Sequence, residues 1–219
     1  MSFLYIVATP IGNLEDITKR ALRILTEVDL ILCEDTMQTQ KLLSHYGIKT
    51  SALSYHQHSK LNKVEYILEL LSQGKNLALV SDAGTPGISD PGGQLVSRVH
   101  GSGFKVIPIP GPSAVTTAAG ISGFPMERFL FLGFPPMKKK RNKFFEEILS
   151  SSYPVIFYES PYRIIKTLKE LSSLSREVVV CRELTKKFET IYRGKIEEVI
   201  EKIERDGVRG EFAVIVNNR

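Results

Sequence analysis

Short apolar runs alternate with amphipathic segments along the whole chain. Residues 3–8 are apolar and rich in side chains that favour strands, and the apolar positions of residues 17–26 recur at helical spacing. Uninterrupted apolar strands separated by amphipathic helices are typical of parallel β-α-β units with helices on both faces of a sheet. We therefore predict an α/β fold.

The same pattern predicts the other elements. In the first half, strands are expected at residues 3–8, 29–33, 50–54, 76–81 and 105–109, and helices at 17–26, 36–46, 62–72 and 93–100. In the second half, strands are expected at 129–133, 155–158, 178–183, 190–194 and 211–216, and helices at 138–149, 162–171 and 196–204. The last three strands lie close together with short links, so we predict a parallel first sheet and a mixed second sheet.

Glycine and proline are densest in the middle of the chain, between Pro108 and Pro125. A stretch rich in glycine and proline is typical of a connection between folded units. We therefore predict an N-terminal α/β domain over residues 1–112 and a C-terminal α/β domain over residues 113–219.

Charge is distributed unevenly between the two halves. The net charge is +5, and residues 1–110 carry 10 basic and 10 acidic side chains, against 19 and 14 in residues 111–219. A basic half beside a neutral half fits a second domain that touches polyphosphate, although a short basic run alone is usually a solvated helix start. The densest basic piece contains Lys138, Lys139, Lys140, Arg141 and Lys143.

Neither a membrane segment nor a metal site is expected. No apolar run approaches the roughly 18 residues that span a bilayer, and the N-terminus lacks the basic segment of a signal peptide. Cys33 and Cys181 lie in apolar runs and are expected to be buried thiols of a cytoplasmic protein. His56 and His58 form the one close histidine pair, and we favour solvated loop residues over zinc ligands.

Four loops that follow apolar strands are candidates for chemistry, because open α/β sheets bind ligands at the carboxyl ends of their strands. The first, residues 8–13, has one glycine where a dinucleotide fold would need G-x-G-x-x-G, and the chain has no G-x-x-x-x-G-K-[ST] motif. Dinucleotide binding and P-loop hydrolysis are therefore disfavoured. A plain turn into a helix is the alternative for this loop.

The second loop, residues 81–93, has four glycines, two prolines and two aspartates in thirteen residues. Glycines allow a ligand to approach the backbone, and prolines hold the loop in one shape. With Asp82 and Asp90 but no lysine or arginine, the loop is unsuited to phosphate and suits a ligand with a cationic centre. Asp90 could instead cap the following helix, which would leave the rest of the loop unexplained.

The third and fourth candidates are less distinctive. In the third, residues 110–114, Ser113 could cap a helix or contact a flat ligand ring. The fourth combines residues 157–161 with residues 181–190, which place charged side chains at two strand ends of the basic half. Surface ion pairs explain these charges as well as a function does.

These loops carry a resemblance to the ribosomal RNA small subunit methyltransferase I family, which is similar in fold to the tetrapyrrole methylases. The motifs that match in order and spacing are TPIGNLxDIT at 9–18, EDT at 34–36, SDAGTPxISDPG at 81–92, PGPSA at 110–114, FYES at 157–160 and RELTK at 182–186. The resemblance covers nearly the whole chain. It implies two α/β domains with a cofactor cleft between them, and a homodimer.

The resemblance also implies an activity: transfer of a methyl group from S-adenosyl-L-methionine to the ribose 2′-hydroxyl of a cytidine in the decoding region of small-subunit (16S) rRNA. Members usually have arginine after the EDT motif, where this chain has Met37, and commonly continue into a C-terminal helical region, whereas this chain stops at Arg219. The residues that match positions lining the cofactor cleft of the superfamily are Pro10, Ser81, Asp82, Gly84, Thr85, Ser113, Ala114, Tyr158, Glu159 and Leu184.

Methyl transfer from a sulfonium is an in-line displacement that needs alignment and exclusion of water, and it requires no metal. Because a ribose hydroxyl is a poor nucleophile, a base or a polarising cation beside it would help. Glu183 and Lys186 are our candidates, with Glu34 and Asp35 in reserve. Two alternatives stay open: a C-methyltransferase acting on a tetrapyrrole such as a precorrin or uroporphyrinogen, and a non-catalytic RNA-binding module.

Overall fold

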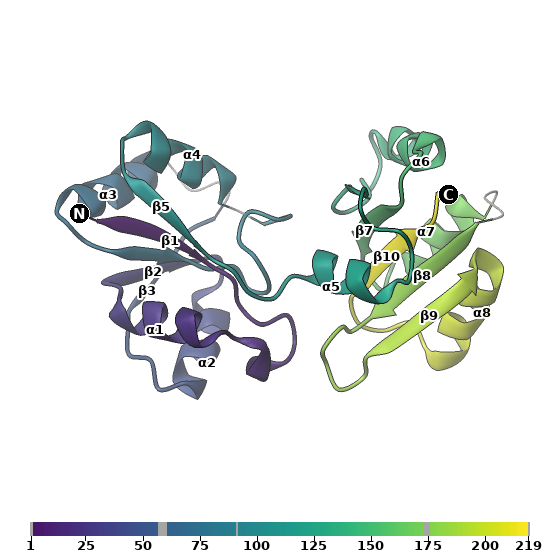
Figure 1. The fold of residues 1–219 in the computed structure, drawn as a ribbon, viewed down its shortest axis with the longest axis horizontal. Coiled ribbons are helices and arrows are strands. Elements are labelled where there is room, and N and C mark those ends of the chain that lie inside the picture. The colour runs from purple at the N-terminus through teal and green to yellow at the C-terminus, as the bar shows by residue number, and fades with distance from the viewer. Residues whose placement is uncertain (1, 57–60, 91, 173–175, 219) are drawn as a thin grey trace. The chain divides into compact units, whose positions relative to one another are not determined.

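The chain folds into two compact α/β units, Met1–Ser113 and Ala114–Arg219, in a computed structural model (Figure 1). The structure describes residues 2–56, 61–90, 92–172 and 176–218. The α/β class predicted from the apolar pattern is confirmed, and each unit is built around one five-stranded sheet.

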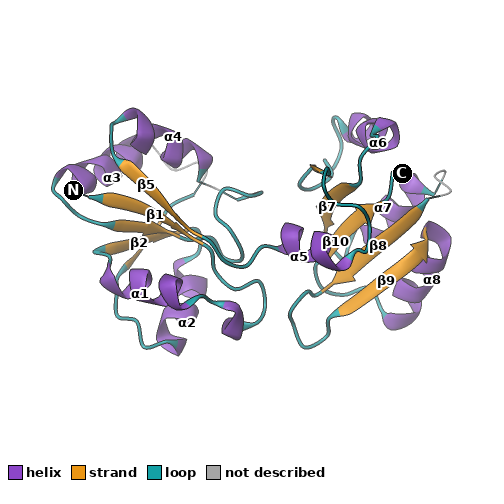
Figure 2. Cartoon of the chain, viewed as in Figure 1, coloured by secondary structure: helices purple, strands orange, loops and turns teal. Residues whose placement is uncertain are grey.

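The first unit has a parallel sheet in the order β3-β2-β4-β1-β5. Helices cover both of its faces (Figure 2): α1 and α2 pack on one apolar cluster, and α3 and α4 on the other. The strands are β1 (Phe3–Val7), β2 (Leu30–Cys33), β3 (Ala52–Ser54), β4 (Leu77–Leu79) and β5 (Lys105–Ile109), and the helices are α1 (Lys19–Glu27), α2 (Thr36–His45), α3 (Leu61–Ser72) and α4 (Gly93–Gly101).

Strands β1 and β4 are central neighbours, and their connections leave in opposite directions. β1 leads through α1 to β2 on one side, and β4 leads through α4 to β5 on the other. Leu4 and Val7 of β1 are fully buried in the two different clusters, which explains why this strand is apolar without alternation. Such a topological switch point is where open α/β sheets bind ligands, outside the carboxyl ends of the strands.

The second unit has the predicted mixed sheet, in the order β6-β7-β10-β8-β9. β6 runs parallel to β7, and the remaining pairs are antiparallel. One continuous core joins its strands to α6, α7 and α8. The strands are β6 (Leu130–Phe131), β7 (Val155–Glu159), β8 (Glu177–Arg182), β9 (Thr190–Lys195) and β10 (Phe212–Val216), and the helices are α5 (Ala114–Ile121), α6 (Arg141–Ser150), α7 (Ile164–Leu171) and α8 (Ile196–Asp206).

One short helix was not predicted, and the predicted start of another helix was wrong. A short 3-10 helix, η1 (Leu14–Asp16), precedes α1, with the Asn13 side chain accepting from Glu15 N at its start. The basic helix expected at 138–149 begins three residues later, at Arg141, because Lys140 has a left-handed φ of 67°. Arg141 is only 8% exposed and is therefore no part of a solvated helix start.

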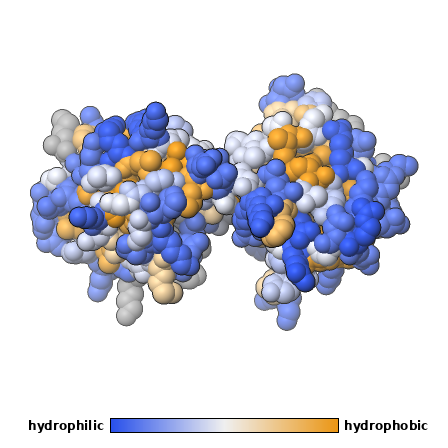
Figure 3. Space-filling view, turned by 90° about the horizontal axis from the view of Figure 1, so that it is seen from below, coloured by the Kyte–Doolittle hydropathy of each residue, from blue (hydrophilic) through white to orange (hydrophobic). Residues whose placement is uncertain are grey.

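The structure shows the surroundings of the two cysteines and of one of the two paired histidines. Cys33 and Cys181 are both free and buried. His56 Nε2 lies 2.7 Å from Ser54 Oγ, whereas His58 lies outside the described residues, as does Pro91 of the loop 81–93. Within the described ranges, none of the helices has the length and apolar character to cross a bilayer. On the face drawn in Figure 3, hydrophilic side chains dominate each unit and apolar ones gather in small areas.

Candidate functional site

Three loops at the carboxyl edge of the parallel sheet are joined to one another by hydrogen bonds. Thr9, after β1, pairs with Gly84, after β4, through Thr9 N to Gly84 O at 2.9 Å and Gly84 N to Thr9 O at 3.0 Å. Thr85 Oγ1 donates to Pro112 O, in the loop after β5, at 3.2 Å. The loops of the switch point therefore form one connected backbone surface.

The buried hydroxyl groups of Ser81 and Thr9 stabilise these loops by hydrogen bonds. Thr9 Oγ1 donates to Ser81 O at 3.0 Å, and Ser81 Oγ lies 3.3 Å from Ala83 O and 3.2 Å from Gly84 O. Both side chains are buried, with 1% of Thr9 and 4% of Ser81 exposed. Their hydroxyls bind the turn itself, so the part of Ser81 in any ligand site is to shape the loop.

Gly84 has a backbone conformation that favours glycine. Its φ is +81°, and a Cβ there would lie 3.4 Å from Ile11 Cγ2 and 3.8 Å from Pro112 O. Both distances are ordinary van der Waals contacts, so another residue would be strained here by its φ and not by lack of space. The positive φ at Gly84 agrees with the use of glycine in this loop, whereas the approach of a ligand to its backbone stays a prediction.

Carboxylates surround this surface. Asp82 Oδ1 accepts from Asp35 N at 3.2 Å, while Asp35 Oδ1 caps α2 by accepting from the backbone of Met37 and Gln38. Burial, and next the charge of Glu34, raise the pKa of Asp90 to about 6, with a smaller contribution from Asp82. The anions therefore repel one another, and a cationic ligand would relieve that repulsion.

The alternative reading of Asp90 as a helix cap is wrong. The N-cap of α4 is Gly92, which makes no side-chain hydrogen bond to the helix. Met37, at the position where the resembled family usually has arginine, is 73% exposed. Its backbone N–H is used by the Asp35 cap, and its side chain stands in solvent.

In the second unit, the ends of β7 and β8 lie at one edge of the sheet. Phe212 of β10 pairs with Glu159 on one side and with Arg182 on the other. Residues 157–161 and the segment after residue 182 are thus brought to the same edge, as expected for a shared site. Tyr158, at the end of β7, packs its ring against Phe131 and Phe134 at centroid distances of 5.0 and 5.4 Å.

Glu159 lies at the centre of a buried polar network. One carboxylate oxygen accepts from Ser160 N at 2.8 Å and pairs with Arg163 at 2.7 Å, and the other accepts from Thr167 Oγ1 at 2.6 Å. Thr167 Oγ1 in turn accepts from Arg141 at 2.9 Å. The Glu159 side chain has no exposed surface, so its charge is used within the protein and the surface-ion-pair reading does not apply to it.

The segment after β8 is backbone-strained. Glu183 and Thr185 have positive φ values of 51° and 66°, which non-glycine residues rarely adopt. Within the described residues, Thr185 Oγ1 and Arg182 Nε are buried without a hydrogen-bond partner. Strain beside unsatisfied polar atoms is a mark of functional segments. No signal in the sequence identified Thr185, because φ cannot be read from residue type there.

The candidate catalytic pair is in direct contact. Lys186 Nζ lies 2.9 Å from Glu183 Oε1 and 2.8 Å from Glu211 Oε2, and Glu211 N donates to the same Glu183 oxygen at 2.9 Å. Partial burial alone would raise the pKa of Glu183, but these hydrogen bonds and the Lys186 charge hold it below its usual value. Glu183 is therefore a weak base, and Lys186 is held as a cation with a pKa raised by the two carboxylates against the opposing effect of burial.

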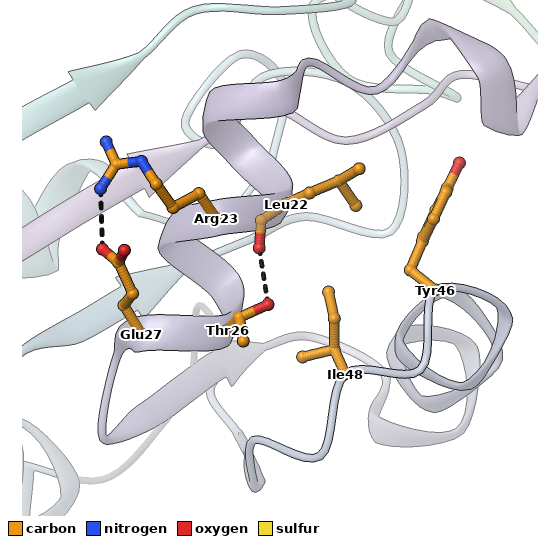
Figure 4. Close-up of a pocket in the computed structure, with 6 residues that line it drawn as sticks. All are labelled: Leu22, Arg23, Thr26, Glu27, Tyr46 and Ile48. Carbon is orange, nitrogen blue, oxygen red and sulfur yellow. Dashed lines mark hydrogen bonds and ion pairs between the residues drawn. The ribbon is translucent and has the colours of Figure 1, made fainter.

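A separate shallow pocket of about 290 Å³ lies against α1 in the first unit (Figure 4). It is lined by Leu22, Arg23, Thr26, Glu27, Tyr46 and Ile48. The charged residues Arg23 and Glu27 pair with each other at 2.8 Å. The pocket shares no residue with the strand-end loops, so it adds nothing to this candidate site.

The predicted cofactor residues thus fall into two groups. Pro10, Ser81, Asp82, Gly84 and Thr85 lie together on the connected loops of the first unit. Ser113 directly precedes α5, which begins at Ala114. Tyr158, Glu159 and Leu184 lie with Glu183 and Lys186 at one edge of the second sheet.

Comparison with known proteins identifies the family. The profile of the Tetrapyrrole (Corrin/Porphyrin) Methylases matches residues 3–200. Proteins named ribosomal RNA small subunit methyltransferase I are similar over nearly the whole chain. The one from Halalkalibacterium halodurans is 48% identical over 216 residues, covering 97% of this chain and 75% of the relative. The one from Thermotoga maritima is 44% identical over 221 residues, covering 100% of both chains.

Solved structures support the same fold at lower sequence identity. A diphthine synthase superposes with a TM-score of 0.76 at 16% identity, covering 99% of this chain and 90% of the other. A cobalt precorrin-4 methyltransferase gives a TM-score of 0.70 at 19% identity, covering 98% and 94%. The profile match and the relatives that are similar over nearly the whole chain show that this chain belongs to the tetrapyrrole methylases and, among them, to the ribosomal RNA small subunit methyltransferase I family.

Proposed function

We propose that this chain methylates the ribose 2′-hydroxyl of a cytidine in the decoding region of 16S rRNA, with S-adenosyl-L-methionine as methyl donor. The observation that carries the proposal is the acidic loop after β4, which is hydrogen-bonded to the loops after β1 and β5 at the switch point of the parallel sheet. Membership of a methyltransferase family supports the reaction type.

The residues present fit such a donor. Its sulfonium and amino groups are cationic, and the carboxylates of Glu34, Asp82 and Asp90 repel one another in the absence of a cation. Gly84 has no side chain, so a flat part of a ligand would be able to lie against the backbone there. The residues that would hold it are Pro10, Ser81, Asp82, Gly84, Thr85, Ser113, Ala114, Tyr158, Glu159 and Leu184.

When bound, S-adenosyl-L-methionine supplies a methyl group that is already activated by its attachment to positive sulfur. The protein has to bind and orient this donor and to exclude water, and loops that are already joined by hydrogen bonds would need little reorganisation to do so. Lys186, an ammonium held between two carboxylates, would lower the pKa of a ribose hydroxyl placed beside it, and the proton that this hydroxyl loses on methylation would pass to solvent water. The lowered pKa of Glu183 favours a role in orienting Lys186 over a role as proton acceptor.

The RNA substrate is supported by the names of the relatives and by charge. The relatives at 48% and 44% identity are both named for small-subunit ribosomal RNA. The excess of basic residues in the second half suits a phosphate backbone. By analogy with the resembled family we also propose a homodimer in the cytoplasm, which sedimentation equilibrium and fractionation of cells would test.

A tetrapyrrole substrate is the second candidate, because the solved structure of cobalt precorrin-4 methyltransferase shares the fold. That likeness is at 19% identity and concerns the fold alone. A methylation assay with small ribosomal subunits, naked 16S rRNA and a precorrin, followed by mapping of the modified nucleotide, separates the substrates. Methylation of the precorrin but of neither RNA substrate would overturn the proposal.

Donor binding is tested by calorimetry with S-adenosyl-L-methionine and with S-adenosylhomocysteine, which lacks the positive sulfur. Asp82→Asn keeps an oxygen that can accept from Asp35 N but removes the charge. We expect it to weaken binding of the donor by about fivefold and binding of the neutral analogue by less. Glu69→Gln, an exposed change on α3, is the matched control. No heat of donor binding to the wild-type chain would leave the RNA-binding module as the surviving reading.

The role of Glu183 is tested separately. Glu183→Gln keeps an acceptor for Glu211 N but weakens the hold on Lys186. We expect slower methyl transfer at unchanged donor affinity. An unchanged rate at unchanged donor affinity would remove Glu183 from the mechanism.

A further inference from the structure

Three large apolar side chains of the second unit are exposed beside its basic run. Tyr162 is 95% exposed, Met137 77% and Phe134 52%. Lys138, Lys139 and Lys140 follow directly and are all exposed. Exposed apolar groups of this size cost free energy in water. Their grouping beside three ammonium groups is typical of an interaction site.

The loop that carries Phe134 and Met137 is held in place by two arginines. Arg163 Nη1 donates to Pro135 O at 3.0 Å, and Arg141 Nη1 donates to Pro136 O, also at 3.0 Å. Both guanidinium groups belong to the buried network of Glu159 and Thr167 described above. Consecutive prolines and two charged hydrogen bonds therefore fix the loop, and the exposed side chains are presented on a rigid backbone.

The other exposed ring, Tyr162, lies on a turn that is tied to the same loop. It precedes Arg163, whose guanidinium reaches the loop at Pro135, so the turn that carries Tyr162 is tied to the loop that carries Phe134. Phe134 itself leans on Tyr158, with 5.4 Å between ring centroids. We name the exposed side chains of Phe134, Met137, Tyr162, Lys138, Lys139 and Lys140 the stacking platform.

The charge of the platform points to its partner. Within the described part of the chain, none of its three lysines forms an ion pair, in contrast to Lys166 and Lys169 of α7, which face Glu170 and Glu204. Unpaired ammonium groups around exposed rings match a strand that offers phosphates and unstacked bases together. A double helix offers its phosphates but keeps its base faces stacked, so it would leave the rings without a partner.

We infer that the stacking platform binds a single-stranded segment of RNA, with Tyr162 stacking on a base and the lysines contacting the phosphates. The inference rests on the proposed function, because it names the surface by which the same chain would hold its RNA substrate. It assigns Tyr162 a binding role that is independent of donor binding and of Glu183 and Lys186.

The test is fluorescence anisotropy of a labelled single-stranded oligoribonucleotide of about ten nucleotides, titrated with the chain of 219 residues. Tyr162→Ala is expected to weaken binding about tenfold or more, whereas Tyr162→Phe, which keeps the ring, stays within about twofold of wild type. Tyr66→Ala, at a tyrosine of α3 that is 48% exposed, is the matched control and is expected to bind as wild type. Since Tyr162 is almost wholly in solvent, its replacement leaves the core intact.

The lysines are tested through salt dependence. Replacing Lys138, Lys139 and Lys140 together by alanine is expected to reduce the slope of log affinity against log salt by about 2, since each single-strand phosphate contact contributes roughly 0.7. A control triple replaces the exposed lysines at 19, 41 and 49 of the first unit and is expected to change the slope by less.

Several outcomes would overturn the inference. Tyr162→Ala could bind as wild type, Tyr162→Phe could be as weak as Tyr162→Ala, or sedimentation could show that Tyr162→Ala changes the oligomeric state, which would make the surface a subunit interface. If wild type methylates 16S rRNA and Tyr162→Ala does so equally well, the platform fails and the proposed function stands. If wild type binds the donor but neither binds nor methylates RNA, both fail.

Discussion

Gly210 and Gly207 allow the contact with Glu183 to be separated from backbone strain. The two glycines have almost the same φ, 82° and 83°. A Cβ at Gly207 would meet nothing within 4 Å, whereas a Cβ at Gly210 would overlap Glu183 Cγ and lie 2.6 Å from its Cδ and 2.7 Å from its Oε1. Gly210→Ala therefore forces the Glu183 side chain to move, and Gly207→Ala does not.

The magnitude follows from what each variant loses. An alanine at positive φ costs about 1 kcal/mol relative to glycine, and both variants share this cost. In Gly210→Ala, the Glu183 carboxylate also loses hydrogen bonds from Lys186 Nζ and Glu211 N. The side chains of Glu183 and Lys186 are 19% and 31% exposed, so solvent screens their interaction. We expect its loss to add about 2 kcal/mol, which gives a total of about 3 kcal/mol.

Urea denaturation followed by circular dichroism measures the free energies of unfolding, and the methylation assay measures the consequence for the candidate pair. Gly210→Ala is expected to slow methyl transfer, and Gly207→Ala to leave it near the wild-type rate. In a Glu183→Ala background the extra cost of Gly210→Ala should disappear. Equal destabilisation by the two glycine variants, or an extra cost that survives without Glu183, would refute the reasoning.

Three further predictions concern buried polar groups. The pKa of Asp90 is raised from 3.8 to about 6, so the folded state favours the protonated carboxyl group. The stabilisation that this group contributes is fully present below about pH 4 and is lost as the pH rises through 6. Asp90→Asn should therefore stabilise the protein by about 1–2 kcal/mol at pH 8, after allowance for screening, and by less at pH 5, as urea denaturation would show; an equal effect at both pH values would contradict this. Thr167→Val removes the hydroxyl that lies between the buried side chains of Arg141 and Glu159. It should lower the free energy of unfolding by about 1–3 kcal/mol, whereas the exposed control Thr26→Val should change it little. Equal losses in the two variants would count against the network. Burial raises the pKa of Cys181 to about 12 and also raises that of Cys33, so neither thiol should react with a disulfide reagent at pH 8 until the chain unfolds, and rapid labelling of the native protein would show otherwise.

Helices and strands could be predicted where one face of an element meets the core. Ile196, Val199, Ile200 and Ile203 recur at helical spacing, and all four are buried in α8. The apolar runs that became β1 and β10 are buried on both faces, which is why they lack alternation. In these segments the residue pattern repeats with the geometry of the element itself, so the neighbours along the chain carry the information.

The start of α6 could not be predicted in that way. Arg141 belongs to a run of basic residues and looks solvated in the sequence, yet it is buried against Thr167 and Glu170. Those partners are 26 and 29 residues away along the chain. The helix begins where this network places the arginine, after a left-handed turn at Lys140.

For the candidate site, composition predicted which loop is exceptional, and tertiary structure decided what each residue in it does. The glycines, prolines and aspartates of residues 81–93 predict a ligand loop from composition alone. Ser81 is buried and its hydroxyl hydrogen-bonds within the turn, and Asp90 does not cap α4. Both facts depend on the strand order and on the packing of the loops after β1 and β5.

The sequence by itself determined the α/β class, the parallel and mixed sheets and the position of the acidic loop, because hydrophobic periodicity and turn composition are local properties. Only the tertiary structure decided that Glu159 is a buried network residue, that Glu183 has a lowered pKa and that the Thr185 hydroxyl is buried without a hydrogen-bond partner among the described residues. The ionisation and hydrogen bonding of a polar group depend on its burial and on partners distant in sequence, and these exist only once the strands have been brought together.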